Sequence, residues 1–163
     1  MISRRNIRVK VMQLLYAVDV MKPDKPSFAG GDLSKTLLRQ IDQTRALVVY
    51  LLDNLVQIAG YAERHARQLA AKHIVTSEDL AFNIKISGNE IIWKIKEDLD
   101  FQNVLRIEKT DSLIDQEIIK KIFLELITTA TYKQYIGEAS REKKAESAII
   151  SFICNILRLT DEG

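Results

Sequence analysis

The sequence predicts an all-α protein, an antiparallel bundle of five to six helices with one of them long. Only 6 glycines and 2 prolines occur among its 163 residues, too few for the many turns of a β-sandwich or barrel. Hydrophobic residues make up 47% and charged residues 28% of the chain, as in an ordinary globular domain. We therefore expect a single helical domain over residues 1–163, either complete or the N-terminal part of a longer protein.

The first predicted helix covers residues 3–21, with Ser3 as its N-cap. One face carries apolar side chains at helical spacing, namely Ile7, Val11, Leu14, Leu15 and Val18. The following stretch, residues 22–32, holds both prolines and the Gly30-Gly31 pair. These residues predict a loop.

A long helix is predicted over residues 33–73. Its apolar stripe alternates in steps of four and three and consists of Leu37, Ile41, Thr44, Val48, Leu51, Leu55, Ile58 and Ala62. Gly60 lies inside this helix, where glycine costs about 1 kcal/mol relative to alanine. We expect a kink or break there unless strong packing tolerates the glycine.

The middle of the chain is less regular. Residues 76–79 resemble a capping box that starts a helix, whereas the alternation over residues 82–86 fits a short strand or an irregular link. Residues 89–99 predict a short helix. Residues 98–111 predict a polar link or a frayed helix.

Two clear helices are predicted at the end of the chain, over residues 115–135 and 141–159. Gly137 is expected to terminate the first, and Ser140 to cap the second. Their inward faces would carry Ile118, Ile119, Ile122, Phe123, Leu126 and Ile127, and then Ala145, Ala148, Ile149, Phe152, Ile153 and Ile156.

The sequence offers little catalytic chemistry. It contains no phosphate-binding loop, dinucleotide fingerprint or HExxH zinc motif. His65 and His73 have no acid or cysteine at ligand spacing, and Trp93 is expected to anchor a core or an interface. We predict a non-enzymatic protein with no metal and no cofactor.

Cys154 is the single cysteine, so neither an intramolecular disulfide nor a cysteine-based zinc site can form. A buried, inert thiol is the expected state. No apolar run approaches 18 residues, and no signal-peptide cleavage site follows the basic start. These features predict a cytoplasmic location.

The distribution of charge is more informative than the net charge of +2. Arg4, Arg5, Arg8 and Lys10 lie at the start of the first helix, with no acid before Asp19. Arginine binds phosphate oxygens through its planar fork, although a solvated basic face on an ordinary helix would show the same pattern. Positive charge at a helix N-terminus opposes the macrodipole, so Arg4 and Arg5 should cost some stability there. This cost indicates that the two arginines bring some other benefit.

Residues 3–17 read SRRNIRVKVMQLLYA. This stretch resembles the opening of the NusB family of bacterial transcription antitermination factors, an arginine-rich segment that runs into a helix. The resemblance implies an all-helical fold and binding to single-stranded, boxA-like RNA of ribosomal RNA leaders. It also implies the ribosomal protein NusE as a partner and an indirect role at the RNA polymerase elongation complex.

The same resemblance assigns RNA contacts to Arg4, Arg5, Arg8 and Lys10. Gln13 and Tyr16 lie in the matched motif and complete the candidate RNA-binding residues. Tyr16 would stack or hydrogen-bond at the RNA, or pack beside Met12 on its own helix. Residues 93–153 resemble the long N-terminal region that some family members carry, and the family's C-terminal core motifs do not occur in these 163 residues.

Two alternatives remain open at this stage. The stripe of residues 37–58 could bind a partner helix or form a homodimer, which would make the chain a helical protein–protein interaction module without nucleic acid binding. The chain could also recruit RNA for an RNA-modifying enzyme whose catalytic part lies elsewhere.

Overall fold

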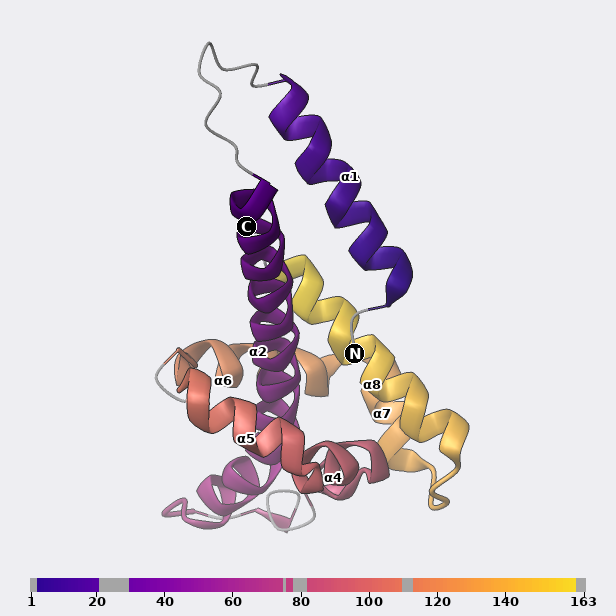
Figure 1. Cartoon of the computed structure of the whole chain (residues 1–163). Helices are drawn as coiled ribbons and strands as arrows, with labels where there is room; N and C mark the ends of the chain where they lie inside the picture. Colours follow the sequence, from indigo (N-terminus) through magenta and orange to yellow (C-terminus); the bar gives the residue numbers. More distant parts are fainter. Residues whose placement is uncertain (1–2, 21–29, 75, 78–81, 110–112, 161–163) are drawn as a thin grey trace. The chain divides into compact units, whose positions relative to one another are not determined.

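The computed structural model describes residues 3–20, 30–74, 76–77, 82–109 and 113–160 (Figure 1). These residues form seven α-helices and one 3₁₀-helix, without a strand, which confirms the all-α fold class. The elements are α1 Arg4–Val20, α2 Gly30–Ala70, η1 Lys85–Gly88, α4 Glu90–Glu97, α5 Leu99–Glu108, α6 Gln116–Thr128, α7 Ala130–Gly137 and α8 Lys143–Thr160. No helix within the described ranges is long and apolar enough to cross a membrane.

The chain divides into two compact units, residues 1–49 and residues 50–163, called here the N-terminal and C-terminal units. The N-terminal unit comprises α1 and the first part of α2. No side chain of α1 is buried, and Val49 is the first buried residue along the described part of α2. Burial of apolar surface therefore contributes little to holding α1 against α2.

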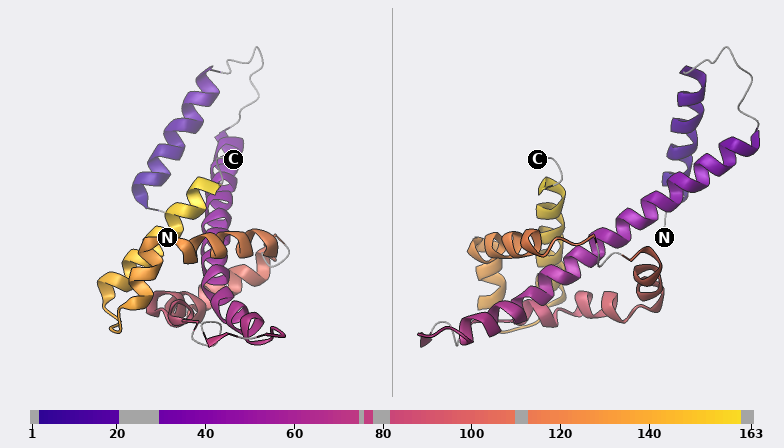
Figure 2. Two further views of the ribbon diagram at one scale, coloured as in Figure 1. Left: turned by 180° about the vertical axis from the view of Figure 1, so that it is seen from behind. Right: turned by 90° about the vertical axis from the view of Figure 1, so that its left-hand side faces the viewer.

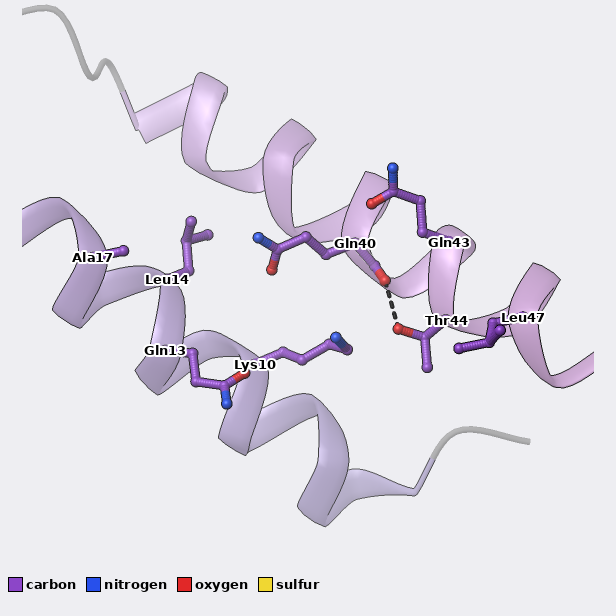
Figure 3. Close-up of a pocket in the computed structure, with 8 residues that line it drawn as sticks. All are labelled: Lys10, Gln13, Leu14, Ala17, Gln40, Gln43, Thr44 and Leu47. Carbon is purple, nitrogen blue, oxygen red and sulfur yellow. Dashed lines mark hydrogen bonds between the residues drawn. The ribbon is translucent and has the colours of Figure 1, made fainter. Parts of the chain in front are cut away.

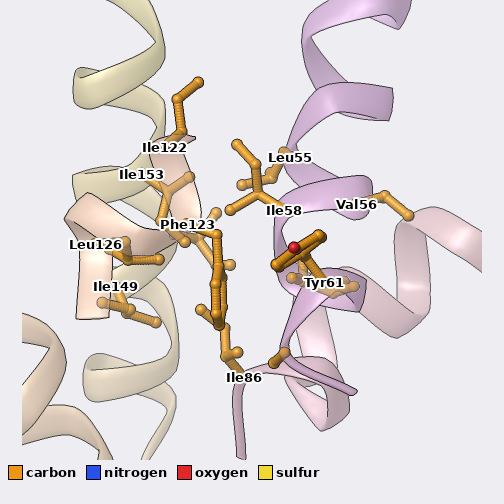
Figure 4. Close-up of a cluster of buried hydrophobic side chains, with 14 of the residues drawn as sticks. Leu55, Val56, Ile58, Tyr61, Ile86, Ile122, Phe123, Leu126, Ile149 and Ile153 are labelled. Atoms are coloured by element: carbon orange, nitrogen blue, oxygen red, sulfur yellow. The ribbon is translucent and has the colours of Figure 1, made fainter. Parts of the chain in front are cut away.

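The hydrophobic core lies in the C-terminal unit. It is built by the second part of α2 with α6, α7 and α8, closed by residues from η1 and α4 (Figure 4). Its most buried large side chains include Leu55, Ile58, Ile86, Ile92, Ile119, Phe123, Leu126, Tyr132, Ile149 and Ile153. In the right-hand view of Figure 2, α6 runs roughly at a right angle to α8, so not all helices around this core lie alongside one another.

The long predicted helix is confirmed as α2, which spans 41 residues. It begins at Gly30, within the predicted loop, and continues through Gly60 without a break. An added Cβ at Gly60 would meet no atom within 4 Å. The glycine is tolerated because the neighbouring residues Ala59 and Tyr61 are buried in the core, which holds the helix together.

The predicted helix over residues 115–135 is divided into α6 and α7 at Thr129. The Thr129 backbone is extended, with ψ of 146°. Its hydroxyl donates to the Leu126 carbonyl at 2.7 Å and accepts the Tyr132 N–H at 3.3 Å. Thr129 therefore stops one helix and caps the next, a local competition that apolar spacing does not reveal.

The predicted polar link over residues 98–111 contains a regular helix, α5. Asp98 caps it by accepting the Phe101 N–H at 2.7 Å, and Lys109 ends it in the left-handed conformation with φ of 50°. Residues 82–84 are irregular and residues 85–88 form η1, so the strand considered for residues 82–86 is absent there.

The last helix starts later than predicted. α8 begins at Lys143, and the Glu142 carbonyl accepts the Glu146 N–H at 2.9 Å, so Ser140 is not its cap. α7 ends at Gly137 as expected, but no described glycine has a positive φ. Ile118 and Ala148, predicted to face inward, are exposed.

Two predictions lie at least partly outside the described residues. The prolines of the predicted loop fall within residues 21–29, and the second half of the predicted capping box falls within residues 78–81.

Two glycine-to-alanine substitutions test the packing described above. Gly60→Ala should raise the free energy of unfolding by up to about 1 kcal/mol, because the helical site is open and alanine lowers the entropy of the unfolded chain. Gly88→Ala should lower it by about 1 kcal/mol. The new Cβ would lie 3.0 Å from Nη2 of Arg141, whose hydrogen bonds it would disturb.

Urea unfolding followed by circular dichroism measures both changes. Equal effects of the two substitutions would contradict the described environments of these glycines.

Candidate nucleic-acid interface

The start of α1 is fixed by Ser3. The Ser3 hydroxyl accepts the Asn6 N–H at 3.2 Å, and the Ser3 carbonyl accepts the Ile7 N–H at 3.1 Å. This confirms Ser3 as the N-cap. The first turn contains no acidic residue, so Arg4 and Arg5 add positive charge to the positive end of the helix dipole.

One side of α1 combines cations with exposed apolar side chains. Arg4, Arg5 and Arg8 are exposed, and the described residues provide none of them with a hydrogen-bond or ion-pair partner. Met12 is 72% and Tyr16 71% exposed. At about 100° per residue, Arg5, Met12 and Tyr16 lie on the same side of the helix with Arg8 beside them. These four residues and Arg4 are called the basic–aromatic face.

The opposite side of α1 faces a groove. Together with the first part of α2, it encloses a surface hollow of ≈ 520 Å³ (Figure 3). The groove is lined by Lys10, Gln13, Leu14, Ala17, Gln40, Gln43, Thr44 and Leu47. The Thr44 hydroxyl donates to the Gln40 carbonyl at 2.8 Å, whereas the carboxamides of the three glutamines have no hydrogen-bond partner in the described part of the chain.

The six sequence-predicted site residues are therefore divided between two places. Arg4, Arg5, Arg8 and Tyr16 lie on the basic–aromatic face, and Lys10 and Gln13 line the groove. Tyr16 is 71% exposed in the part of the chain that the structure describes, so most of its ring is accessible there.

The packing face of α1 differs from the predicted stripe at one position. Leu15 is 55% exposed, whereas Ala17 is half-buried and lines the groove. The half-buried positions are Ile7, Lys10, Val11, Leu14, Ala17 and Val18. The face turned toward α2 thus includes a lysine and an alanine. A helical pattern of large apolar side chains does not identify these two residue types.

His65 and Cys154 both lie among apolar or aromatic neighbours. The His65 ring packs against Phe82 and Phe123, with centroids 5.0 and 5.6 Å apart. Burial raises the pKa of the Cys154 thiol, which keeps it protonated and poorly nucleophilic. The described residues contain no group of three or more His, Cys, Asp or Glu that could hold a metal ion.

Trp93 is not a core residue, because 51% of it is exposed. Nζ of Lys96 lies 5.8 Å from the centre of its ring, within the range of a cation–π contact.

A buried polar cluster that sequence reasoning missed lies around Glu146, in the first turn of α8. The Glu146 side chain is nearly fully buried. Its Oε1 accepts the Tyr135 hydroxyl at 2.8 Å, and its Oε2 accepts the Glu90 N–H at the start of α4 at 3.1 Å. The carboxylate thus lies at the N-terminus of α4, where a helix stabilises negative charge.

Asn89 and Arg141 complete this cluster. The Asn89 carboxamide accepts the Ile91 N–H at 2.9 Å as the cap of α4 and donates to the Glu146 carbonyl at 3.1 Å. Arg141 lies 3.6 Å from the Glu146 carboxylate and donates to carbonyls of η1. Every partner of the carboxylate is thereby a donor, which compensates its removal from water.

Lys85 ties η1 to the end of α7. Its ammonium donates to the carbonyls of Tyr135, Glu138 and Ser140 at 2.8, 2.7 and 3.0 Å. It also lies 4.4 Å from the centre of the Tyr135 ring. All three donors of this lysine are used, so its role is to cap a helix C-terminus and it is not available to a ligand.

The two buried tyrosines of α7 differ in their partners. Burial raises the pKa of Tyr132 to about 12. The pKa of Tyr135 is also raised to about 12, chiefly by burial and to a smaller extent by the hydrogen bond to Glu146. Both hydroxyls therefore stay protonated at neutral pH. The Tyr135 hydroxyl donates to Glu146, whereas the Tyr132 hydroxyl has no partner within the described structure.

The cluster had no recognisable sequence signal, because its members come from four segments separated by up to 57 positions. The basic–aromatic face, by contrast, is contiguous in the sequence.

Comparison with known proteins gives no match to any family model, curated protein or solved structure.

Substituting the two tyrosines by phenylalanine should have opposite effects. Tyr132→Phe should raise the free energy of unfolding by about 1 kcal/mol, because it removes a buried hydroxyl that has no partner. Tyr135→Phe should lower it by about 2 kcal/mol, because it takes a donor from a buried carboxylate. Chemical denaturation of the two matched variants measures the difference, and the account is wrong if Tyr132→Phe destabilises as much as Tyr135→Phe.

Proposed function

We propose that this protein is a non-enzymatic RNA-binding factor that contacts single-stranded RNA through α1. The observation that supports this proposal most directly is the exposure of Arg4, Arg5 and Arg8 on one side of a helix, without neutralising partners among the described residues. Three cations held within two helical turns match the closely spaced phosphates of a nucleic acid strand.

The exposed Tyr16 supports single-stranded over double-stranded RNA. Sequence-specific proteins bind unpaired bases by stacking them on aromatic side chains. Tyr16 is 71% exposed and lies on the same side of α1 as Arg5. An unpaired strand whose phosphates contact the arginines could stack a base on this ring.

The resemblance to the NusB family extends the proposal to a biological role. In that role the chain would act in the cytoplasm. It would bind boxA-like leader RNA together with NusE and assist antitermination by RNA polymerase. The arginine-rich start that carries the resemblance is also the segment on which the exposed cations lie.

Removal of the three arginines should weaken RNA binding without unfolding the protein. We expect Arg4→Ala/Arg5→Ala/Arg8→Ala to lower the affinity for labelled boxA RNA at least about tenfold and to reduce the log–log salt slope by about 2, since each phosphate contact on a single strand contributes about 0.7. Fluorescence anisotropy across a salt series, with boxA and scrambled RNA and with and without NusE, measures both quantities.

The triple variant Lys121→Ala/Lys133→Ala/Lys144→Ala is the matched control, because it removes the same charge from exposed positions of the C-terminal unit. It should bind RNA as the unchanged protein does. Equal losses in the two variants would mean that only net charge matters and would contradict a site on α1.

Exposed apolar side chains in the N-terminal unit favour a second candidate function, binding to another protein. Met12, Leu38 and Leu47 are 72%, 60% and 55% exposed, as in surfaces that bind another protein. Absence of RNA binding at physiological salt, together with a dimer in light scattering, would support this interaction module in place of the RNA-binding factor.

A further inference from the structure

The groove between α1 and the first part of α2 has features that play no part in the phosphate contacts proposed for the arginines. It is a hollow of ≈ 520 Å³, a size that admits a flat heterocyclic base. Three glutamines line it, Gln13, Gln40 and Gln43, and no described residue occupies the donors and acceptors of their carboxamides. In Figure 3 the Gln40 carboxamide is directed toward α1, whereas that of Gln43 points away from it. Polar groups without partners beside a hollow are available to a ligand that presents the complementary pattern.

The remaining lining defines how such a ligand would lie. Leu14, Ala17 and Leu47 supply apolar surface, which suits the face of an aromatic ring. Figure 3 shows Lys10, Leu14 and Gln40 directed into the space between the two helices. The Lys10 ammonium, for which the described residues offer no acceptor, could contact the phosphate that belongs to the bound base.

We propose that this groove is a subsite for one unpaired adenine base. A glutamine carboxamide has an acceptor and a donor side by side, and adenine presents the matching N6–H donor and N7 acceptor on one edge. Guanine presents two acceptors on the same edge and is matched better by arginine or lysine. The proposal rests on the proposed function, and it adds base selection to the sequence-independent contacts of the basic–aromatic face.

The two sites lie on different sides of the same short helix. An α-helix with its side chains is about 10 Å across, a distance that a single nucleotide spans from its phosphate to the edge of its base. A strand whose phosphates contact Arg5 and Arg8 could therefore direct a neighbouring base into the groove.

The test compares two RNAs that differ in one base. The probes are a 12-nucleotide oligouridine and the same oligomer with one central adenine, so that both carry the same phosphates. We expect the unchanged protein to bind the adenine-containing oligomer at least about fivefold more tightly, as expected for one bidentate base contact. The variant Gln13→Ala/Gln40→Ala/Gln43→Ala should bind both oligomers within about twofold of each other, with an unchanged salt slope.

Gln134→Ala is the control, because Gln134 is an exposed glutamine on α7 in the C-terminal unit. It should keep the adenine preference, and circular dichroism should show the same helix content in all variants. Retention of the preference by the triple glutamine variant would overturn the subsite.

The unchanged protein separates the remaining outcomes. Binding of both oligomers with equal affinity would overturn the adenine subsite and leave the RNA-binding proposal intact. Binding of neither would overturn both.

Discussion

The structure depends on one continuous helix, α2, whose surroundings change along its length. Within residues 50–62 its side chains enter the core, where Leu55, Ile58, Ala59 and Ala62 are almost fully buried. Before Val49 no described side chain of the helix is buried. Since packing of an apolar face stabilises helices more than intrinsic propensity does, the first part of α2 gains its order chiefly from helical continuity with the second. The groove is lined in part by this less protected stretch, and the basic–aromatic face lies on α1, where no side chain is buried.

The C-terminal unit is specified by a polar cluster as well as by its apolar core. The Glu146 carboxylate joins the start of α8 to the start of α4 and to Tyr135 on α7, and Lys85 joins η1 to the end of α7. An unpaired buried carboxylate would be costly, so the cluster favours one arrangement of these elements. Because its cations are already bonded, this cluster is structural. Arg4, Arg5 and Arg8 of α1, by contrast, are exposed and have no partner among the described residues.

The sequence pattern predicted those features of the fold that depend on residues close together in the chain. The all-α class, the long helix and the Ser3 cap of α1 follow from periodicity and capping chemistry, and the structure confirms them. The break at Thr129 was missed because it depends on a hydroxyl that competes with the helix for backbone groups. The cluster around Glu146 was missed because it joins distant segments. The exposed arginines were predictable since they are adjacent in the sequence, whereas the groove required knowledge of how α1 faces α2.

Amide hydrogen exchange, measured with and without single-stranded RNA, tests most directly the central claim that the N-terminal unit is the RNA interface. Without RNA, amides of residues 50–70 should exchange slowly and those of residues 4–20 and 33–48 much faster, because local opening is easiest where few apolar side chains are buried. RNA should slow exchange in residues 4–20 and 33–48 and leave residues 50–157 unchanged. Protection gained only within residues 50–157, or no gain while RNA is bound, would contradict the account.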